Sequence, residues 1–301
     1  METKSVETIC VVGASFMGTQ IGLHCAVYGY TVRIVDISRD VMKKAAEMQR
    51  LELESRVKAG QLTPEEMKAI RNRISFTRDI AKGAAGADLA IESVTERLEI
   101  KRDVFMQLDR VCPAHTLLAT NSSSLRISAI EDATRRPEKV LNLHFYPPVW
   151  ERPMVELMRG TQTSDETIET MRRFARTLKL TPLTVLREST GFIFNRIWRV
   201  IKKEALNLVD EGVATHEDVD RAWIIATGMP IGIFGLMDMI GLDVVREIEM
   251  VYQQESGEEK DLPPKLLHHK IEKKELGVKT GKGFYTYPDP VFNEPRWLRG
   301  S

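Results

Sequence analysis

The sequence predicts an α/β fold in two parts: a doubly wound, mostly parallel sheet, and after it an all-helical C-terminal domain. Three observations predict this. Short apolar strands alternate with helical patterns in the first part of the chain, only helical patterns follow Gly191, and a glycine loop joins the first strand to the first helix. We therefore place the domain boundary near residue 188, with domains at 1–188 and 189–301.

Composition narrows the class of protein. The chain has 301 residues with 43 basic and 43 acidic side chains, so its formal net charge is zero. A protein with this charge balance has no net positive charge that would attract nucleic acid or an anionic membrane. The sequence also has no run of about 18 apolar residues, so no membrane-spanning helix is predicted. The three cysteines, Cys10, Cys25 and Cys112, are odd in number and far apart. We therefore expect neither a disulfide framework nor a zinc site, and a cytoplasmic protein.

The strands of the first domain are short apolar runs, and the helical patterns between them end at glycine or proline, namely Gly29, Gly60 and Pro113. The predicted strands are Val6–Val12, Thr31–Asp36, Ile74–Thr77, Asp88–Val94, Thr116–Thr120, Val140–Tyr146, Met154–Met158 and Leu183–Arg187. The predicted helices among them are Met17–Tyr28, Asp40–Lys58 and Glu96–Val111.

The second domain reads as helices separated by glycine and proline turns. The predicted helices are Ile193–Glu211, Glu217–Thr227, Ile240–Gln254 and Lys265–Glu275. The segment from Gly228 to Met237 is rich in Gly, Met and Ile, and we interpret it as a loop that either lines a ligand pocket or simply packs. His268 and His269 are adjacent, so they point to different sides of a helix and make a poor metal pair; no metal site is predicted.

The loop after the first strand matches a dinucleotide fingerprint at two of its three glycines. Gly13 makes the tight turn, Gly18 allows close packing, and Ser15 stands where the middle glycine would be. Phe16 and Met17 complete the loop and open the helix, so we assign all five positions to cofactor binding. Ser15 is interpreted as a tolerated substitution that crowds the phosphate but can also donate to it.

An acidic residue strengthens the fingerprint. The second strand ends at Asp36, 23 residues after Gly13. A carboxylate there can accept hydrogen bonds from both ribose hydroxyls of the adenosine half, and it repels a 2′-phosphate. The sequence therefore predicts a Rossmann-type domain that binds NAD rather than NADP. Arg39 is interpreted as a solvated helix-start residue, and a βα turn that binds nothing is the alternative.

Strand pairing predicts a contact between a histidine and a glutamate. If the strands around His144 and Glu156 pair antiparallel about residue 150, the two residues lie directly opposite and share one face of the sheet. The carboxylate could then hold one ring nitrogen and leave the other free to take a proton, as hydroxyl oxidation requires. Spacing alone supports equally a buried pair that only ties two strands together.

Several segments in order resemble the 3-hydroxyacyl-CoA dehydrogenase family, and the likeness runs from Val11 to Tyr285. Besides the glycine loop, the matching segments are Ala87–Glu92, Glu96–Lys101, Asn121–Leu125, His144–Phe145, Met154–Glu156, Gly191–Arg196 and Lys279–Tyr285. The resemblance implies a nucleotide-binding N-terminal domain and a helical C-terminal domain that dimerises.

The resemblance also implies roles. His144 matches the catalytic base and Glu156 its partner, while Ser123 and Asn195 match the residues that fix the substrate oxygen. Both are short donors suited to an oxygen whose charge changes. Read locally, Ser123 could instead belong to a helix cap and Asn195 to a helix start.

The same resemblance extends to the cofactor. Glu96, Lys101 and Lys279 match positions that contact NAD, and Asn121, which opens the serine segment, is assigned with them.

The sequence departs from the family in the turn after His144. The family has asparagine after His-Phe-Phe, whereas here Tyr146 is followed by Pro147, and Trp150 and Glu151 reshape the turn.

Positions that touch CoA in the family differ as well. Glu52 and Ala59 stand at these positions, with Arg56 and Lys58 close by. The prediction is therefore an NAD-dependent (S)-3-hydroxyacyl-CoA dehydrogenase acting on a small molecule as a homodimer. The alternatives are the same chemistry on a free 3-hydroxy acid and a non-catalytic NAD-binding relative.

Overall fold

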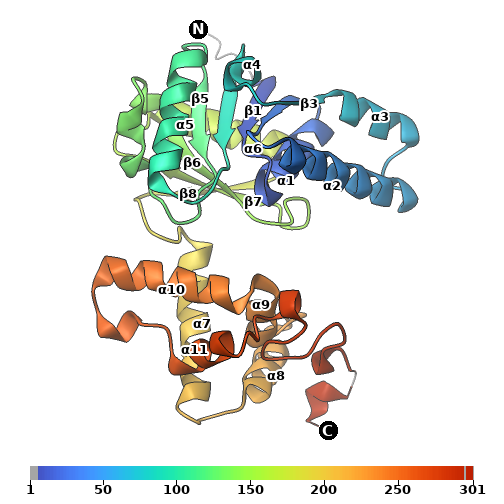
Figure 1. Ribbon diagram of the computed structural model, residues 1–301, viewed down its shortest axis with the longest axis vertical. Coiled ribbons are helices and arrows are strands. Elements are labelled where there is room, and N and C mark those ends of the chain that lie inside the picture. Colours follow the sequence, from blue (N-terminus) through green and yellow to red (C-terminus); the bar gives the residue numbers. More distant parts are fainter. Residues whose placement is uncertain (1–5, 295, 301) are drawn as a thin grey trace. The chain divides into compact units, whose positions relative to one another are not determined.

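The computed structural model describes residues 6–294 and 296–300 (Figure 1). By internal contacts the chain forms two compact units, one up to Ile193 and the other from Phe194 onward. This division falls a few residues after the boundary predicted near 188. Among the described residues, no helix is both long and apolar enough to cross a bilayer.

The first unit is built on one eight-stranded sheet with the order β3-β2-β1-β4-β5-β6-β7-β8. The strands are β1 (Thr8–Val12), β2 (Thr31–Val35), β3 (Ile74–Thr77), β4 (Leu89–Glu92), β5 (Leu117–Thr120), β6 (Val140–Phe145), β7 (Met154–Arg159) and β8 (Thr181–Val185). Neighbouring strands pair in parallel except β6 and β7, which are antiparallel. The doubly wound, mostly parallel sheet predicted from the sequence is therefore confirmed.

Helices cover both faces of this sheet, because the strands carry apolar side chains on both sides. Ile9 and Val11 of β1 belong to one apolar cluster, and the alternate residues Cys10 and Val12 belong to another. The first cluster is completed by α1 (Phe16–Val27), α2 (Arg39–Lys58), α3 (Pro64–Asn72) and α6 (Asp165–Thr177), the second by α4 (Ile80–Ala84) and α5 (Leu98–Val111). Figure 1 shows α5 and α1 at different sides of the strands.

Three of these helices and several strand boundaries differ from the prediction. Helices α3, α4 and α6 were not predicted, although Thr63 forms a capping box at α3 and Ser164 caps α6. The last strand was predicted at Leu183–Arg187 and lies two residues earlier. It includes Pro182, which is tolerated because β8 is an edge strand.

The second unit is helical, as predicted. It contains α7 (Phe194–Asp210), α8 (His216–Thr227), α9 (Ile233–Ile240), α10 (Leu242–Ser256) and α11 (Lys265–Glu272). The interpretation of 228–237 as a loop was wrong, since α9 begins at Ile233 and packs Phe234 and Met237 into the core. Gly241, at φ +99°, separates α9 from α10, which therefore begins two residues later than predicted.

Candidate active site

The glycine loop requires glycine at both matched positions. Gly13 has φ +105°, and a Cβ there would lie 2.4 Å from the carbonyl oxygen of Ser93. A Cβ on Gly18 would lie 1.9 Å from the carbonyl oxygen of Gly13 and 3.4 Å from the Val11 side chain. The first glycine thus permits the turn, and the second lets helix α1 close onto loop and strand.

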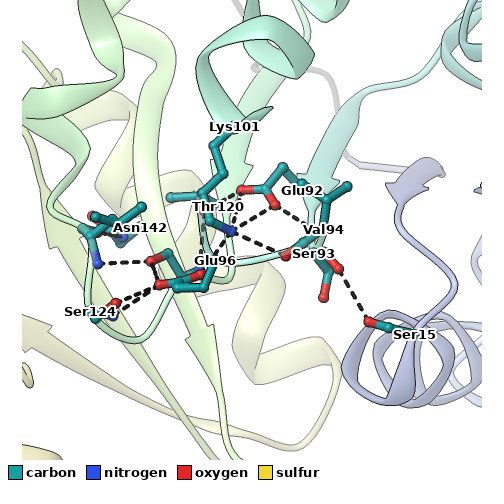
Figure 2. Close-up of polar contacts among 11 residues, drawn as sticks. Ser15, Glu92, Ser93, Val94, Glu96, Lys101, Thr120, Ser124 and Asn142 are labelled. Atoms are coloured by element: carbon teal, nitrogen blue, oxygen red, sulfur yellow. Dashed lines mark hydrogen bonds and ion pairs between the residues drawn. The ribbon is translucent and has the colours of Figure 1, made fainter. Parts of the chain in front are cut away.

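Ser15 fits the loop without strain. Its backbone is extended (φ −68°, ψ −174°), and its hydroxyl donates to the Ser93 carbonyl oxygen at 3.3 Å (Figure 2). Ser15 and Phe16 are exposed and Met17 is half-buried. The amides of the first turn of α1 have no partner within the helix, so this end of α1 suits a diphosphate.

Asp36 is fixed beside this loop by two backbone amides. Its Oδ2 accepts from the N–H of Ala14 at 2.8 Å, and its Oδ1 accepts from the N–H of Ser38 at 2.8 Å. Each carboxylate oxygen keeps acceptor capacity for a ribose hydroxyl. Together with the steric constraint at Gly13, this arrangement fits the adenosine diphosphate half of NAD.

A buried charge network lies at the ends of β4 and β5 (Figure 2). The Lys101 side chain is 1% exposed, and its Nζ lies 2.9 Å from an oxygen of Glu92 and 3.0 Å from one of Glu96. Glu92 also accepts from the Thr120 hydroxyl at 2.6 Å and from the N–H of Val94 at 2.6 Å. Glu92 was not among the predicted site residues, although a charged residue that ends an apolar strand was a usable signal.

The network continues into the serine segment after β5. Glu96 accepts from the hydroxyls of Ser122 and Ser124, the latter at 2.7 Å. Burial opposes ionisation of Glu96, but the Lys101 ammonium and these hydroxyls hold the pKa of its carboxyl below the usual range. Ser123, between the two bound serines, is exposed.

The serine segment also has a local structural role. The Ser122 hydroxyl accepts from the N–H of Leu125 at 2.9 Å, so it caps a turn, and no α-helix begins there. Asn121 uses its side-chain oxygen to accept from the N–H of Phe145 at 2.9 Å. Asn121 therefore links the end of β5 to the residue after His144.

The pairing of His144 with Glu156 is confirmed. The two residues are directly opposite in the antiparallel β6–β7 pair, and His144 Nδ1 lies 3.2 Å from Glu156 Oε2. His144 is 5% exposed and Glu156 is fully buried. Because Nδ1 faces the carboxylate, Nε2 is the nitrogen that can exchange a proton with a substrate.

Four further contacts shape this pair. The Tyr146 hydroxyl donates to the same oxygen of Glu156 at 2.7 Å, and the N–H of Ile193 donates to the other at 2.9 Å. The His144 ring contacts the rings of Tyr146 and Phe192, at centroid distances of 4.5 and 4.9 Å. From the sequence, Tyr146 was the predicted end of a strand and part of a departure from the family pattern, and no local signal indicated that its hydroxyl would reach Glu156.

The remaining predicted site residues, Asn195 and Lys279, lie in the second unit. Asn195 is half-buried in the first turn of α7. Lys279 lies in a 3₁₀ turn, Val278–Thr280, and forms an ion pair with Asp243 of α10.

One of the two basic residues near the predicted CoA positions, Arg56, already contacts other side chains. Arg56 pairs with Glu52 at 2.8 Å, and its guanidinium lies over the Trp150 ring at 4.9 Å from the centroid. Trp150 belongs to the turn between β6 and β7, so α2 contacts the segment that joins the strands of His144 and Glu156. Lys58 is exposed.

Comparison with known proteins places this architecture in a family. The profile of the 3-hydroxyacyl-CoA dehydrogenase NAD-binding domain matches residues 8–189, and that of the C-terminal domain of the same family matches 191–287. A probable 3-hydroxybutyryl-CoA dehydrogenase of Bacillus subtilis is 35% identical over 94% of this chain and 98% of its own. The 3-hydroxybutyryl-CoA dehydrogenase of Clostridioides difficile is 34% identical over 93% and 99%.

Superposition on solved structures supports the same family. The (S)-3-hydroxybutyryl-CoA dehydrogenase of Ralstonia eutropha superposes with a TM-score of 0.89 at 33% identity, covering 95% of this chain and 100% of that one. A diketoreductase superposes with a TM-score of 0.85 at 32% identity, over 94% and 100%. The chain therefore belongs to the 3-hydroxyacyl-CoA dehydrogenase family of NAD-dependent oxidoreductases.

Proposed function

We propose that this protein oxidises the 3-hydroxyl group of a short (S)-3-hydroxyacyl-CoA with His144 as the catalytic base. The observation that carries the proposal is the 3.2 Å contact between His144 Nδ1 and Glu156 Oε2 in an enzyme of this family. That contact fixes the ring orientation and leaves Nε2 to take the hydroxyl proton. It also stabilises the imidazolium that forms, because the carboxylate is buried beside it.

Ser123 and Asn195 are proposed to hold the C3 oxygen. Ser123 is exposed at the carboxyl end of β5, where open α/β sheets bind ligands, and Glu96 holds the serines on both sides of it. A hydroxyl and an amide offer hydrogen bonds to an oxygen that changes from hydroxyl to carbonyl. Asn195 lies in the first turn of α7, in the second unit.

The cofactor site is proposed to consist of the loop residues, Asp36 and the charge network. Gly13, Ser15, Phe16, Met17 and Gly18 hold the diphosphate. Asp36 holds the adenosine ribose, and Asn121, Glu96, Lys101 and Lys279 border the nicotinamide half. When bound, NAD supplies the electron sink that takes the hydride from C3. Since Lys101 is buried between Glu92 and Glu96, it acts through Glu96.

A free 3-hydroxy acid is the second candidate substrate. It is favoured by the engagement of Arg56 with Glu52 and Trp150, which leaves this guanidinium less available for the phosphates of CoA. The structurally similar diketoreductase is described as acting on dicarbonyl compounds, and its description does not mention CoA.

One assay separates the two candidates. NADH formation is followed with (S)-3-hydroxybutyryl-CoA, longer 3-hydroxyacyl-CoA thioesters and free 3-hydroxybutyrate. We expect the short thioester to give the highest kcat/KM. His144→Ala should lower kcat by about 10²- to 10⁴-fold and leave NADH affinity intact. Activity with the free acid alone would favour the second candidate, and retained turnover in His144→Ala would exclude the proposed base.

His269→Ala is the matched control, because His269 is exposed on α11 in the second unit. It should keep the turnover of the unmodified enzyme. No NADH from any of these substrates, with the fold intact, would contradict the proposed function as a whole.

We also propose that residues 1–188 bind NAD, that residues 189–301 form the substrate and dimerisation domain of a homodimer, and that the protein acts in the cytoplasm. The second unit exposes apolar side chains on neighbouring helices, among them Val200 of α7 and Ile248 of α10. The three cysteines are buried free thiols, which suits a reducing compartment.

A further inference from the structure

Tyr146 shares one carboxylate oxygen with the catalytic histidine. Glu156 Oε2 receives the Tyr146 hydroxyl at 2.7 Å and His144 Nδ1 at 3.2 Å. The tyrosine bond is the shorter of the two, and both rings are nearly buried, at 4% and 5% exposure. The two donors therefore compete for the negative charge on a single buried atom.

We propose that Tyr146 is a positioning residue that tunes how tightly the His144–Glu156 pair holds its proton. The proposal rests on the proposed function, because it concerns the base of that reaction.

The direction of the effect follows from charge. When the pair has lost its proton, His144 is neutral and Glu156 is negative; when it holds the proton, the pair is neutral overall, whichever residue carries it. The tyrosine hydroxyl stabilises the negative state more, because its bond to a carboxylate with unbalanced charge is stronger than one to a carboxylate that an imidazolium or a proton already neutralises. Tyr146 therefore favours the deprotonated, base-competent pair.

The surroundings of Glu156 let the Tyr146 hydrogen bond have a large effect on the proton affinity of the His144–Glu156 pair. Glu156 is fully buried, so water does not screen its charge. Within the first unit, His144 of β6 and Tyr146 directly after it are titratable groups that contact the carboxylate. The segment before α7 supplies the uncharged amide of Ile193. Phe192, which also contacts the imidazole, is apolar.

The variant Tyr146→Phe removes only the hydroxyl and keeps the ring that packs on His144. It tests the proposal through the pH dependence of kcat/KM for 3-hydroxybutyryl-CoA oxidation. We expect the midpoint of the acidic limb to rise by about one pH unit, so activity falls most at low pH. A limb that stays in place, or a loss that is equal at every pH, would overturn the proposal.

Tyr30→Phe is the matched control. Its hydroxyl contacts Thr177 of α6, away from the His144–Glu156 pair, and its loss should leave the limb where it is. NADH affinity and the melting temperature of each variant show whether the fold and cofactor site persist.

A second readout does not depend on turnover. The His144 ring resonance, assigned by its absence in His144→Gln, is followed by NMR against pH in the unmodified protein and in Tyr146→Phe. We expect its midpoint to rise in Tyr146→Phe by the same amount. If the enzyme proves inactive but this shift is seen, the proposed function fails while the inference stands. If the enzyme is active and neither midpoint moves, only the inference fails.

Discussion

Single residues in this protein tolerate buried charge because their partners are supplied locally. Lys101 is almost fully buried, yet its ammonium lies between the carboxylates of Glu92 and Glu96. An isolated ammonium there would be prohibitively costly, whereas a paired and hydrogen-bonded one is not. The consequence reaches Ser122 and Ser124, which Glu96 holds on either side of Ser123.

Ser15 gives a prediction at the same scale. Its side chain projects where the middle glycine of the fingerprint would give the diphosphate room, and its φ of −68° suits any residue. Ser15→Gly should therefore tighten NADH binding modestly, by less than about tenfold, or 1.4 kcal/mol. A fluorescence titration measures the dissociation constant. Unchanged or weaker binding would show that the Ser15 hydroxyl, donating to Ser93 or to phosphate, outweighs the crowding.

At the scale of elements, α1 is buried along most of its length because it packs between the sheet and α2. Gly22 lies so close to β2 that a Cβ would lie 2.8 Å from the Ile34 side chain. Even its histidine is buried: His24 is 4% exposed, and its Nε2 donates to the carbonyl oxygen of Leu178 at 3.1 Å. Burial lowers the pKa of His24 to about 4.

This burial predicts acid sensitivity of the first unit. Because the pKa of His24 is 6.5 when unfolded and about 4 when folded, the unfolded chain binds more protons below pH 6.5. Stability should fall from pH 6.5 toward pH 4, with about 2 kcal/mol lost from this residue between pH 8 and pH 5.

His24→Gln keeps a donor for Leu178 and cannot ionise. It should reduce the acid loss by that amount in urea unfolding at the two pH values. Equal acid loss in the variant and the unmodified protein would contradict the assignment. His269→Gln, exposed in the second unit, serves as the control substitution.

At the scale of the whole molecule, the chain divides its work between two units with separate cores. The sheet unit has apolar clusters on both faces of the sheet, and the helical unit has its own around Phe234 and Leu206. Asp238 ties the helical unit's C-terminal segment in place, accepting from the N–H groups of Phe284 and Tyr285 at 2.9 and 2.8 Å. A Cβ on Gly283 would lie 2.0 Å from that carboxylate, which explains the glycine there.

The proposed dimer can be tested at an exposed apolar side chain of α7. Val200 of α7 is 64% exposed, and a charge at the proposed interface would be desolvated on association. Val200→Glu should raise the dimer dissociation constant at least tenfold, about 1.4 kcal/mol, as measured by sedimentation. Glu204→Gln, exposed on the same helix, should have little effect. A monomeric unmodified protein at micromolar concentration would refute the dimer itself.

Local sequence patterns predicted much of the first unit. The eight strands, the glycine loop and Asp36 follow from short-range signals, because strand period and turn chemistry are properties of a few consecutive residues. The short helices α3, α4 and α9 were missed for the same reason: five to nine residues carry too little periodicity to stand out from a loop.

By itself, the sequence determined the doubly wound sheet, the helical second part and, once the two strands pair about residue 150, the opposition of His144 to Glu156, since register follows from the apolar pattern of the strands and the turn that joins them. Only the tertiary structure decided what else meets that carboxylate. It brought the Tyr146 hydroxyl and the Ile193 amide to Glu156, and it buried Lys101 between two acids. Such contacts depend on side-chain direction, and the Ile193 amide also comes from a segment distant along the chain; no local pattern encodes either.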